Sequence, residues 1–209
     1  MKLIRKLITT LASERKNRGF YFTFVMNTVH CIGIFRGVFF KVLYLNQIEC
    51  SIFSLQSNSS IEIFNRSSKV TIGKFVFIRK NASLRVDYKG HLKLGDHVFI
   101  NDNCNINCVN KVTIGSYSKI ASGVSINDHD HNYKQSNGDH LLKGEVHIGK
   151  NVWIGSNVTI LRNTTIGDNS VIAAGSVVKG NIPDNTVFVI KRENKHIPIE
   201  EKRKVQEIS

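Results

Sequence analysis

The sequence predicts an all-β solenoid in which short parallel strands wind around a narrow aliphatic core. The first observation is a strict six-residue spacing of aliphatic anchors, at Ile148, Ile154, Ile160, Ile166, Ile172 and Val178. The second is a mostly small or β-branched residue four positions after each anchor, at Val152, Val158, Thr164, Ser170, Ser176 and Ile182. A helix repeats its apolar residues every three to four positions and a half-buried strand every two, so a period of six fits neither. It fits a coil of three strands per turn, each directing one aliphatic side chain inward.

The same period extends upstream with two slips. After a slip at Asp87–Gly90, the anchors resume at Leu94, Ile100 and Ile106. After a second slip of two residues they return at Ile114, Ile120 and Ile126. We place the slips at corners of the coil, where an added residue costs little. The pattern predicts five complete turns and allows a sixth at the start.

Three regions are expected along the chain. Residues 1–47 form a basic and aromatic N-terminal cap, residues 48–185 form the solenoid, and residues 186–209 form a C-terminal tail. A polar excursion at 127–147 suspends the repeat and carries four of the eight histidines. A long irregular loop on a rigid scaffold usually has a functional reason.

The N-terminal cap has two possible roles. Residues 1–18 are expected to form a basic amphipathic helix. The aromatic stretch 20–45 contains Gly33 and Gly37, which weaken any single helix there. We favour a role in covering the first open turn of the solenoid. The alternative is peripheral membrane contact through residues 1–46, because a basic amphipathic segment can lie in the membrane interface. The two roles are compatible.

Charge limits the classes of partner. The formal net charge is +13, and residues 1–46 contribute +7, from eight Lys and Arg less the single Glu14. A basic surface attracts phosphates, acidic polymers and anionic membranes. Because no nucleic-acid-binding motif accompanies the charge, we expect no nucleic-acid partner. An acidic substrate or a phosphorylated co-substrate is the better prediction.

Location and redox state follow from what the sequence contains. No run of eighteen uncharged apolar residues occurs, so no spanning helix is expected. No signal peptide is recognised, and we expect a cytoplasmic protein, with the inner face of the membrane as an option. The four cysteines form no zinc-like CxxC pair. Cys104 occupies the small-residue slot of the repeat and is expected to be packed and reduced.

Two strings in the repeat identify a family resemblance. The strings Asn151-Val152-Trp153-Ile154-Gly155 and Gly167-Asp168-Asn169-Ser170-Val171-Ile172-Ala173-Ala174-Gly175-Ser176-Val177-Val178, together with the histidine-bearing loop, resemble the left-handed parallel β-helix (hexapeptide-repeat) acyltransferases. Asp128-His129-Asp130-His131 and the basic, aromatic N-terminus resemble the O-acetyltransferases of surface polysaccharides. The spacing from His129 to Trp153 resembles that of the capsular sialic acid O-acetyltransferases.

The resemblance implies a homotrimer that uses acetyl-CoA, with active sites between subunits and no metal. By motif position, His129 is the expected general base in a direct transfer, since a neutral imidazole can take a sugar hydroxyl proton near neutral pH. His131 is the rival base. Asp128 or Asp130 could orient the ring, although a backbone carbonyl would serve equally well.

The remaining site residues are also carried over from the resemblance. Trp153 matches a position where the family places an aromatic at the acceptor and thioester site. The residues expected to meet coenzyme A are Ser156, Ala174, Lys179, Lys191 and Arg192. Related sugar enzymes carry an acidic residue near Val109, which this chain lacks. With Asn101 and other asparagines nearby, the acceptor pocket is expected to be neutral or basic, which suits an anionic sugar.

The leading functional hypothesis is acetyl-CoA-dependent O-acetylation of a surface or capsular polysaccharide, including polysialic or sialic-acid-containing polymers. One alternative is acetylation of a small molecule: a free sugar, serine or an antibiotic. Another is a non-catalytic binding solenoid. A metal-dependent carbonic anhydrase is disfavoured because the histidines crowd one loop. A nucleotide-sugar N-acetyltransferase is disfavoured because the N-terminal domain associated with that group is missing.

Overall fold

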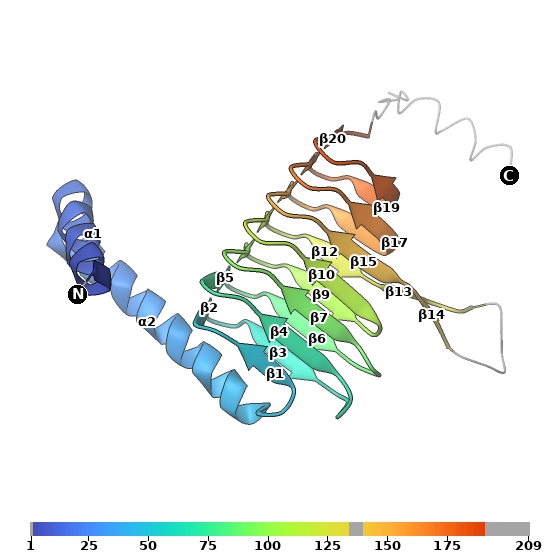
Figure 1. Ribbon diagram of the computed structural model, residues 1–209, viewed down its shortest axis with the longest axis horizontal. Coiled ribbons are helices and arrows are strands. Elements are labelled where there is room, and N and C mark those ends of the chain that lie inside the picture. The colour runs from blue at the N-terminus through green and yellow to red at the C-terminus, as the bar shows by residue number, and fades with distance from the viewer. Residues whose placement is uncertain (1, 134–139, 191–209) are drawn as a thin grey trace, which may run out of the picture.

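The protein is a parallel β-solenoid of about six turns preceded by two helices, as the computed structural model shows (Figure 1). The structure describes residues 2–133 and 140–190. The parallel solenoid confirms the predicted fold class, an all-β solenoid of six-residue repeats. The optional sixth turn exists at the start of the coil, because the first strand begins at Ile48.

The strands form three faces. The first face contains β1 (Ile48–Cys50), β4 (Lys69–Ile72), β7 (His91–Leu94), β10 (Lys111–Ile114) and β15 (Glu145–Ile148). The second contains β2 (Phe53–Leu55), β5 (Val76–Ile78), β8 (Phe99–Ile100), β11 (Lys119–Ile120), β16 (Trp153–Ile154), β18 (Val171–Ile172) and β20 (Val187–Phe188). The third contains β3 (Ser60–Ile63), β6 (Ser83–Val86), β9 (Asn105–Cys108) and β12 (Ser125–Asn127). Two longer strands, β17 (Thr159–Ile166) and β19 (Val177–Ile182), run from the third face onto the first.

The core is a column of aliphatic side chains in register. Each anchor of the six-residue repeat from Ile148 to Val178 is buried, as are the residues four positions after them. Parallel pairing places anchor over anchor, for example Ile120 over Ile154 and Ile154 over Ile172. Cys104 is buried and unpaired with another cysteine, as expected. Because each turn is too small to bury its own side chains, stacking supplies the core.

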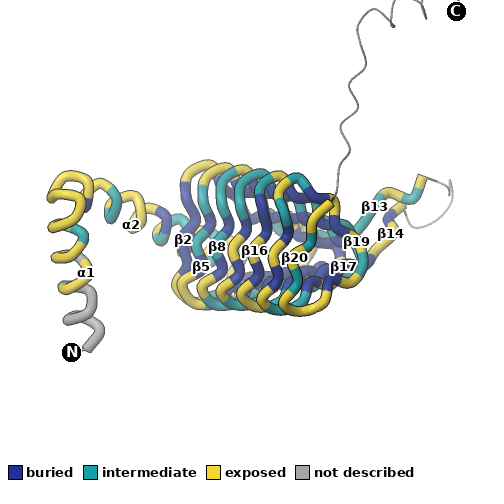
Figure 2. Tube along the Cα trace, turned by 90° about the horizontal axis from the view of Figure 1, so that it is seen from above, coloured by how far each residue is buried: buried dark blue, intermediate teal, exposed yellow. Residues whose placement is uncertain are grey.

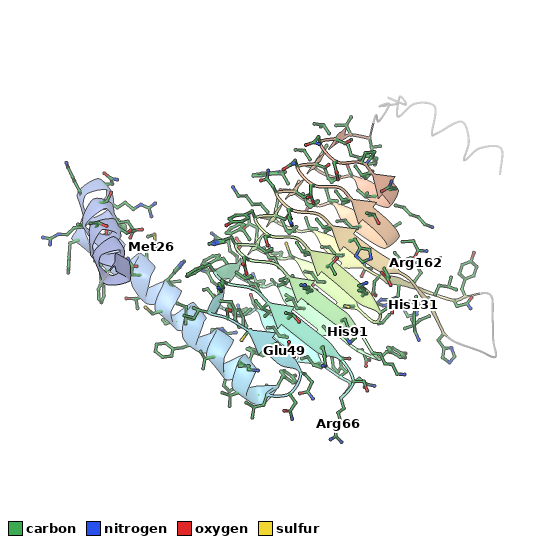
Figure 3. The ribbon with its side chains drawn as sticks, viewed as in Figure 1. Met26, Glu49, Arg66, His91, His131 and Arg162 are labelled. Carbon is green, nitrogen blue, oxygen red and sulfur yellow. The ribbon has the colours of Figure 1, made fainter. Side chains whose placement is uncertain are left out.

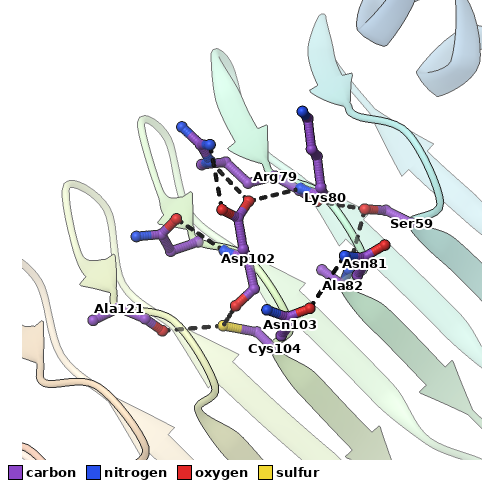
Figure 4. A network of polar contacts seen from close by, with 10 residues as sticks. Ser59, Arg79, Lys80, Asn81, Ala82, Asp102, Asn103, Cys104 and Ala121 are labelled. Atoms are coloured by element: carbon purple, nitrogen blue, oxygen red, sulfur yellow. Dashed lines mark hydrogen bonds and ion pairs between the residues drawn. The ribbon is translucent and has the colours of Figure 1, made fainter.

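Hydrogen bonds from polar side chains connect successive turns at the corner between the second and third faces. Asp102 accepts from Arg79 Nε at 2.9 Å and from the backbone nitrogen of Lys80 at 3.1 Å (Figure 4). Asn81 Nδ2 donates to Oδ1 of Asn103 at 3.2 Å, and both asparagines have positive φ. Asparagine tolerates this left-handed backbone better than most residues, so it suits a tight corner.

One excursion leaves the solenoid. After β12 the chain forms an antiparallel hairpin of β13 (His129–His131) and β14 (Leu141–Lys143), and it returns to the first face at β15. The hairpin projects away from the coil (Figures 1 and 2). Its tip, residues 134–139, lies outside the described residues.

Two helices precede the coil, α1 (Lys2–Arg18) and α2 (Phe20–Leu43), joined at Gly19. The expected helix at 1–18 is present. The expectation that Gly33 and Gly37 would weaken a single helix is wrong, because both are buried where α2 packs on β2. A Cβ on Gly37 would lie 2.9 Å from the carbonyl oxygen of Phe53, so the glycines permit close helix–strand contact.

The outer surface of α2 is apolar and largely uncovered (Figure 2). By length and composition this helix could cross a membrane, whereas the sequence predicted no such segment. That expectation demanded an uncharged run, which Arg36 and Lys41 interrupt. Only about one sixth of the apolar window is buried, so α2 is not a core helix (17% buried).

Candidate active site

The insertions in the repeat all fall on one corner of the coil. This loop corner, between the third and first faces, holds the linkers 64–68, 87–90 and 109–110, followed by the hairpin excursion from 128 to 144. In the next two turns β17 and β19 pass this corner without a break. The inserted residues of successive turns therefore lie above one another and build a local surface that the regular repeat cannot make.

Asp128 is the buried polar centre of the loop corner. Its side chain has no exposed surface. Its carboxylate oxygens lie 3.0 Å from the backbone nitrogen of Val109, and Oδ2 lies 2.8 Å from that of Asn110. A buried carboxylate is costly unless such donors compensate it. The two-residue insertion at 109–110 supplies these donors, so the second slip of the repeat has a structural purpose.

His129 takes its orientation from Asp128. Nδ1 of the ring lies 2.9 Å from Oδ1 of Asp128, and the histidine side chain is 19% exposed. Because the carboxylate already accepts from backbone N–H groups on both oxygens, it acts as an acceptor, and Nδ1 carries the proton it shares with Asp128. The lone pair of Nε2 is then free to accept a proton. This geometry suits the expected role of His129 as a general base.

A cavity of about 270 Å³ opens beside this ring. It is lined by Phe64, Arg85, Asp87, Tyr88, Asn107, Cys108, Val109, His129, His131 and Leu141. A larger cavity of about 740 Å³ lies between α2 and the coil, and His129 does not line it. The smaller cavity is the candidate active site because it combines an oriented base with polar groups from several turns.

The two aspartates of the Asp128-His129-Asp130-His131 string have different partners. Asp130 Oδ2 accepts from Nε of Arg162 at 2.7 Å, and Arg162 lies on β17. Figure 3 shows Arg162 and His131 at the base of the projecting hairpin. Of the two candidates for orienting the ring, the geometry therefore selects Asp128, whereas Asp130 ties the hairpin to the coil. His131 is more exposed than His129 but lines the same cavity.

The cavity has mixed charge. Arg85 Nε is paired with Glu62 Oε2 at 3.1 Å, and Lys143 Nζ lies 4.8 Å from the centre of the Tyr88 ring. Asp87 adds a carboxyl that the expectation of a neutral or basic pocket did not include. Burial, and then the neighbouring charge of Asp128, raise the pKa of the Cys108 thiol far above its usual value. That thiol stays protonated and is not a nucleophile.

Trp153 and Asn101 lie away from this cavity within one chain. Trp153 sits on the second face, is 51% exposed and pairs with Lys119 and Val171. Asn101 follows β8 at the corner between the second and third faces, where its Oδ1 accepts from the backbone nitrogen of Asp102. Neither residue lines the cavity with His129. Trp153 can join that site only from another subunit.

The candidate coenzyme residues occupy two corners. Ser156 and Ala174 are neighbours between the second and third faces, where Gly175 donates to the Ser156 carbonyl at 2.8 Å. Gly155 makes this stacking possible, because a Cβ there would lie 2.6 Å from the Ala174 nitrogen. Val178 is in register with Ile160, which is in register with Ile126. Lys179 follows Val178 and is exposed, so it takes the place of Asn127, where the chain enters the loop corner. Lys191 and Arg192 lie outside the described residues.

His147 belongs to a separate polar cluster on the first face. Its Nδ1 lies 2.9 Å from Thr113 Oγ1 and its Nε2 lies 2.6 Å from Glu145 Oε2. The hydrogen bond with His147, followed by the charge of Lys111, lowers the pKa of Glu145. Among the described residues, no three His, Cys, Asp or Glu side chains are grouped to hold a metal ion.

Sequence reasoning missed Arg85, Asp87 and Tyr88 of the cavity, which strand register would have found. Glu62, Arg85, Asn107 and Asn127 are paired one above another in four successive turns of the third face. Asn107 Nδ2 donates to Asn127 Oδ1 at 2.8 Å within this column. The two slips of the six-residue period could have revealed these residues. When the turns are aligned with each slip treated as an insertion, residues 85–88 and 107–110 fall beside the histidine loop.

Comparisons with known proteins agree with this architecture. Residues 145–180 match the family described as bacterial transferase hexapeptide (six repeats). Nodulation protein L of Rhizobium meliloti (strain 1021) is 38% identical over 93 residues, which are 44% of this chain and 50% of that protein. The chain thus spans half the length of this curated relative.

Solved structures share the fold. A mutant of AntD, an N-acyltransferase from Bacillus cereus, in complex with dTDP and coenzyme A has a TM-score of 0.56 and 18% identity, covering 80% of this chain and 94% of AntD. A second AntD mutant, in complex with dTDP-4-amino-4,6-dideoxyglucose and coenzyme A, has a TM-score of 0.51 and 20% identity, covering 73% and 87%. Residues 145–180 thus match the transferase hexapeptide repeat, and the chain shares the fold of a solved N-acyltransferase over 80% of its length.

Proposed function

We propose that this protein is an acetyl-CoA-dependent O-acetyltransferase that acetylates a hydroxyl of a surface or capsular polysaccharide, with His129 as the general base. The observation that carries the proposal is the pair of Asp128 and His129, in which a buried, amide-bound carboxylate leaves Nε2 of the ring free beside a cavity. The transferase repeat at 145–180 and the coenzyme A found in the AntD structures support the choice of acyl donor.

The proposed reaction needs one proton carrier. Acetyl-CoA supplies the acyl group as a thioester. Nε2 of His129 accepts the proton of the acceptor hydroxyl as its oxygen bonds to the acetyl carbonyl carbon. The carbon–sulfur bond then breaks, and the same proton passes from Nε2 to the departing sulfur. The products are an acetyl ester and free coenzyme A, so no acyl-enzyme is required.

We propose that the site is completed by a second subunit of a homotrimer. Small residues at the corner of Ser156 and Ala174 leave room for a pantetheine arm to approach the backbone, with Lys179 available to a phosphate. In one chain, however, this corner and Trp153 are on different sides of the coil from His129. Packing of flat solenoid faces against each other would bring Trp153 of one subunit toward His129 of another.

We propose an anionic acceptor, such as a polysialic or sialic-acid-containing polymer. Arg85 lines the cavity, Lys143 lies over the ring of Tyr88 in the cavity wall, and His131 adds a third group able to bear positive charge. Asp87 on the same wall can accept a hydrogen bond from a neutral sugar hydroxyl. The proposed location is the cytoplasm, where acetyl-CoA is available.

The test is acetyl-CoA consumption with polysialic acid, neutral capsular polymers, free sialic acid, free neutral sugars and serine. Wild type is compared with His129→Ala and His131→Ala. We expect turnover of the anionic polymer, a loss of about 10²–10⁴ in rate for His129→Ala, and a much smaller loss for His131→Ala. Turnover of free sugars or serine alone would favour a small-molecule acetyltransferase. Absence of both turnover and coenzyme A binding would contradict the acyltransferase proposal.

The trimer has its own test. Light scattering of the purified protein should give three times the chain mass. If it does, Trp153→Ala subunits mixed with His129→Ala subunits should recover activity at the sites that receive both intact residues. A monomeric active enzyme would remove Trp153 from the site.

A further inference from the structure

We infer that α2 is a membrane-docking helix that lies in the plane of an anionic phospholipid bilayer, with one face bound to the solenoid and the opposite face in the lipid interface. The inference does not depend on the proposed reaction. It rests on how the charged, small and aromatic residues of α2 are distributed around the helix.

The solenoid side of α2 contains the small residues and both cations of the helix. Gly33 and Gly37 pack on Ser54 and Phe53. Arg36 Nη2 donates to the Ser59 carbonyl at 2.9 Å. Lys41 Nζ donates to the Leu45 carbonyl at 3.1 Å and also to the Ile48 carbonyl. The only charged side chains of α2 are therefore fixed by backbone carbonyls next to the coil.

The opposite side of α2 carries no charge at all. At 100° per residue, the side chains that point away from Gly33 and Gly37 include Phe20, Tyr21, Phe24, Cys31, Phe35, Val38, Phe39 and Val42. Phe24 is 61% exposed and Phe35 is 71% exposed. From Phe24 to Val42 this strip is about 27 Å long, from the rise of about 1.5 Å per residue. A continuous exposed apolar strip of this length marks an interaction surface.

The charge next to the strip identifies a bilayer as its occupant. Arg15, Lys16 and Arg18 are exposed at the end of α1, immediately before α2 begins. The N-terminal 46 residues hold eight cations against the single Glu14. Basic residues beside an apolar helix face are the pattern of an interfacial segment on anionic lipid.

The same contacts favour an interfacial helix over a spanning one. Crossing the bilayer would detach Gly33 and Gly37 from β2 and would place Arg36 and Lys41 in hydrocarbon without their carbonyl partners. Lying in the interface keeps every one of these contacts and buries only the uncharged strip. The solenoid would then be held beside the membrane surface by its first turn.

Vesicle flotation of the full chain tests the lipid preference. We expect binding to vesicles of phosphatidylcholine with phosphatidylglycerol, and little binding to phosphatidylcholine alone. Val38→Gln with Val42→Gln should weaken binding roughly tenfold or more. The matched control, Val187→Gln with Val189→Gln on the last turn, should change nothing, although these valines are also exposed. Arg15→Gln with Lys16→Gln should lose about fivefold per charge on anionic vesicles only.

Alkylation of Cys31 tests the orientation. Cys31 lies in the apolar strip and is exposed, Cys50 is half-buried, and Cys104 and Cys108 are buried, so the test uses a Cys50→Ser chain. Anionic vesicles should slow its reaction with a maleimide. Val187→Cys in a chain that also carries Cys31→Ser should react at the same rate with and without vesicles.

Three results would overturn the inference. Protection of Cys31 without vesicles would show that protein, such as a second copy, covers the strip. Retention on vesicles through alkaline carbonate washing would show a spanning helix. Equal binding by the valine pairs on α2 and on the last turn would show that the strip does not contact lipid.

Discussion

Oδ1 of Asp128 lies 2.9 Å from Nδ1 of His129. The carboxylate that orients this partly exposed histidine is itself fully buried. Two backbone amides, from Val109 and Asn110, hold the carboxylate in place. The ring is therefore positioned from inside the solenoid, by a turn that lies nineteen residues earlier in the chain (Val109 to Asp128). This relationship gives the first prediction.

Asp128→Asn should reduce both stability and activity. An asparagine amide would present N–H groups where the backbone of Val109 and Asn110 needs acceptors, which is expected to cost about 1–3 kcal/mol. The ring of His129 would also lose the acceptor that fixes its tautomer. The readouts are urea unfolding and the pH profile of kcat, since a purely structural defect would leave the profile of the remaining folded enzyme unchanged.

Asp130→Asn is the matched control for that variant. It changes the neighbouring aspartate, which is paired with Arg162 rather than with the ring. We expect an unaltered pH profile of kcat. An equal change of profile in both variants would contradict the assignment of Asp128 as the positioning residue.

Arg162→Gln should loosen the hairpin without unfolding the coil. The Arg162 and Asp130 side chains are paired at 2.7 Å but remain partly exposed, so the stability loss should be small, at most about 1 kcal/mol. The acceptor KM should rise because the hairpin carries His131 and Leu141 of the cavity wall. Limited proteolysis of the hairpin should be faster in Arg162→Gln than in wild type. The control is Arg85→Gln, which removes another cation near the cavity, one that is paired with Glu62. Its hairpin should be cleaved at the wild-type rate.

Ile154→Ala should destabilise the solenoid by about 2–5 kcal/mol, because this fully buried anchor packs between Ile120 and Ile172. Val171→Ala is the control from the same face, since Val171 points outward and is 37% exposed. It should cost about 0.5 kcal/mol or less. Comparing the urea midpoints of the two variants checks whether the anchors of the six-residue period are the residues that form the core.

Acid should weaken the corner shown in Figure 4. The pKa of Asp102 lies below its usual value, chiefly because the Arg79 guanidinium donates a hydrogen bond to the carboxylate. A lowered folded-state pKa means that Asp102 contributes stability above its unfolded pKa of about 3.9, and that this contribution is lost as pH falls through the folded pKa.

The variant Asp102→Asn should therefore lose up to about 1 kcal/mol at neutral pH and show a flatter acid dependence below pH about 4. Glu49→Gln, which changes an exposed acid on β1, is the control. Thermal unfolding between neutral pH and mild acid measures both. An acid dependence identical to that of wild type in Asp102→Asn would mean that other carboxyls govern it.

Much of the fold was predictable because the core repeats. A period of six specified which residues face inward, and Ile148, Ile160 and Ile172 are buried as expected. The single α2 was not predictable from the same pattern. Its two glycines lower the helix propensity of the isolated segment. In the folded protein they stabilise the helix, because their lack of a Cβ permits close packing on β2.

The sequence by itself determined the solenoid, its buried anchors and the place where the repeat is interrupted by histidines, since these follow from local spacing. Tertiary structure alone decided that Asp128 rather than Asp130 orients His129, and that Trp153 lies on a different face. The physical reason is register. Which side chains meet at the loop corner depends on the length of each insertion, because a residue added in one turn shifts what stacks above it in the next.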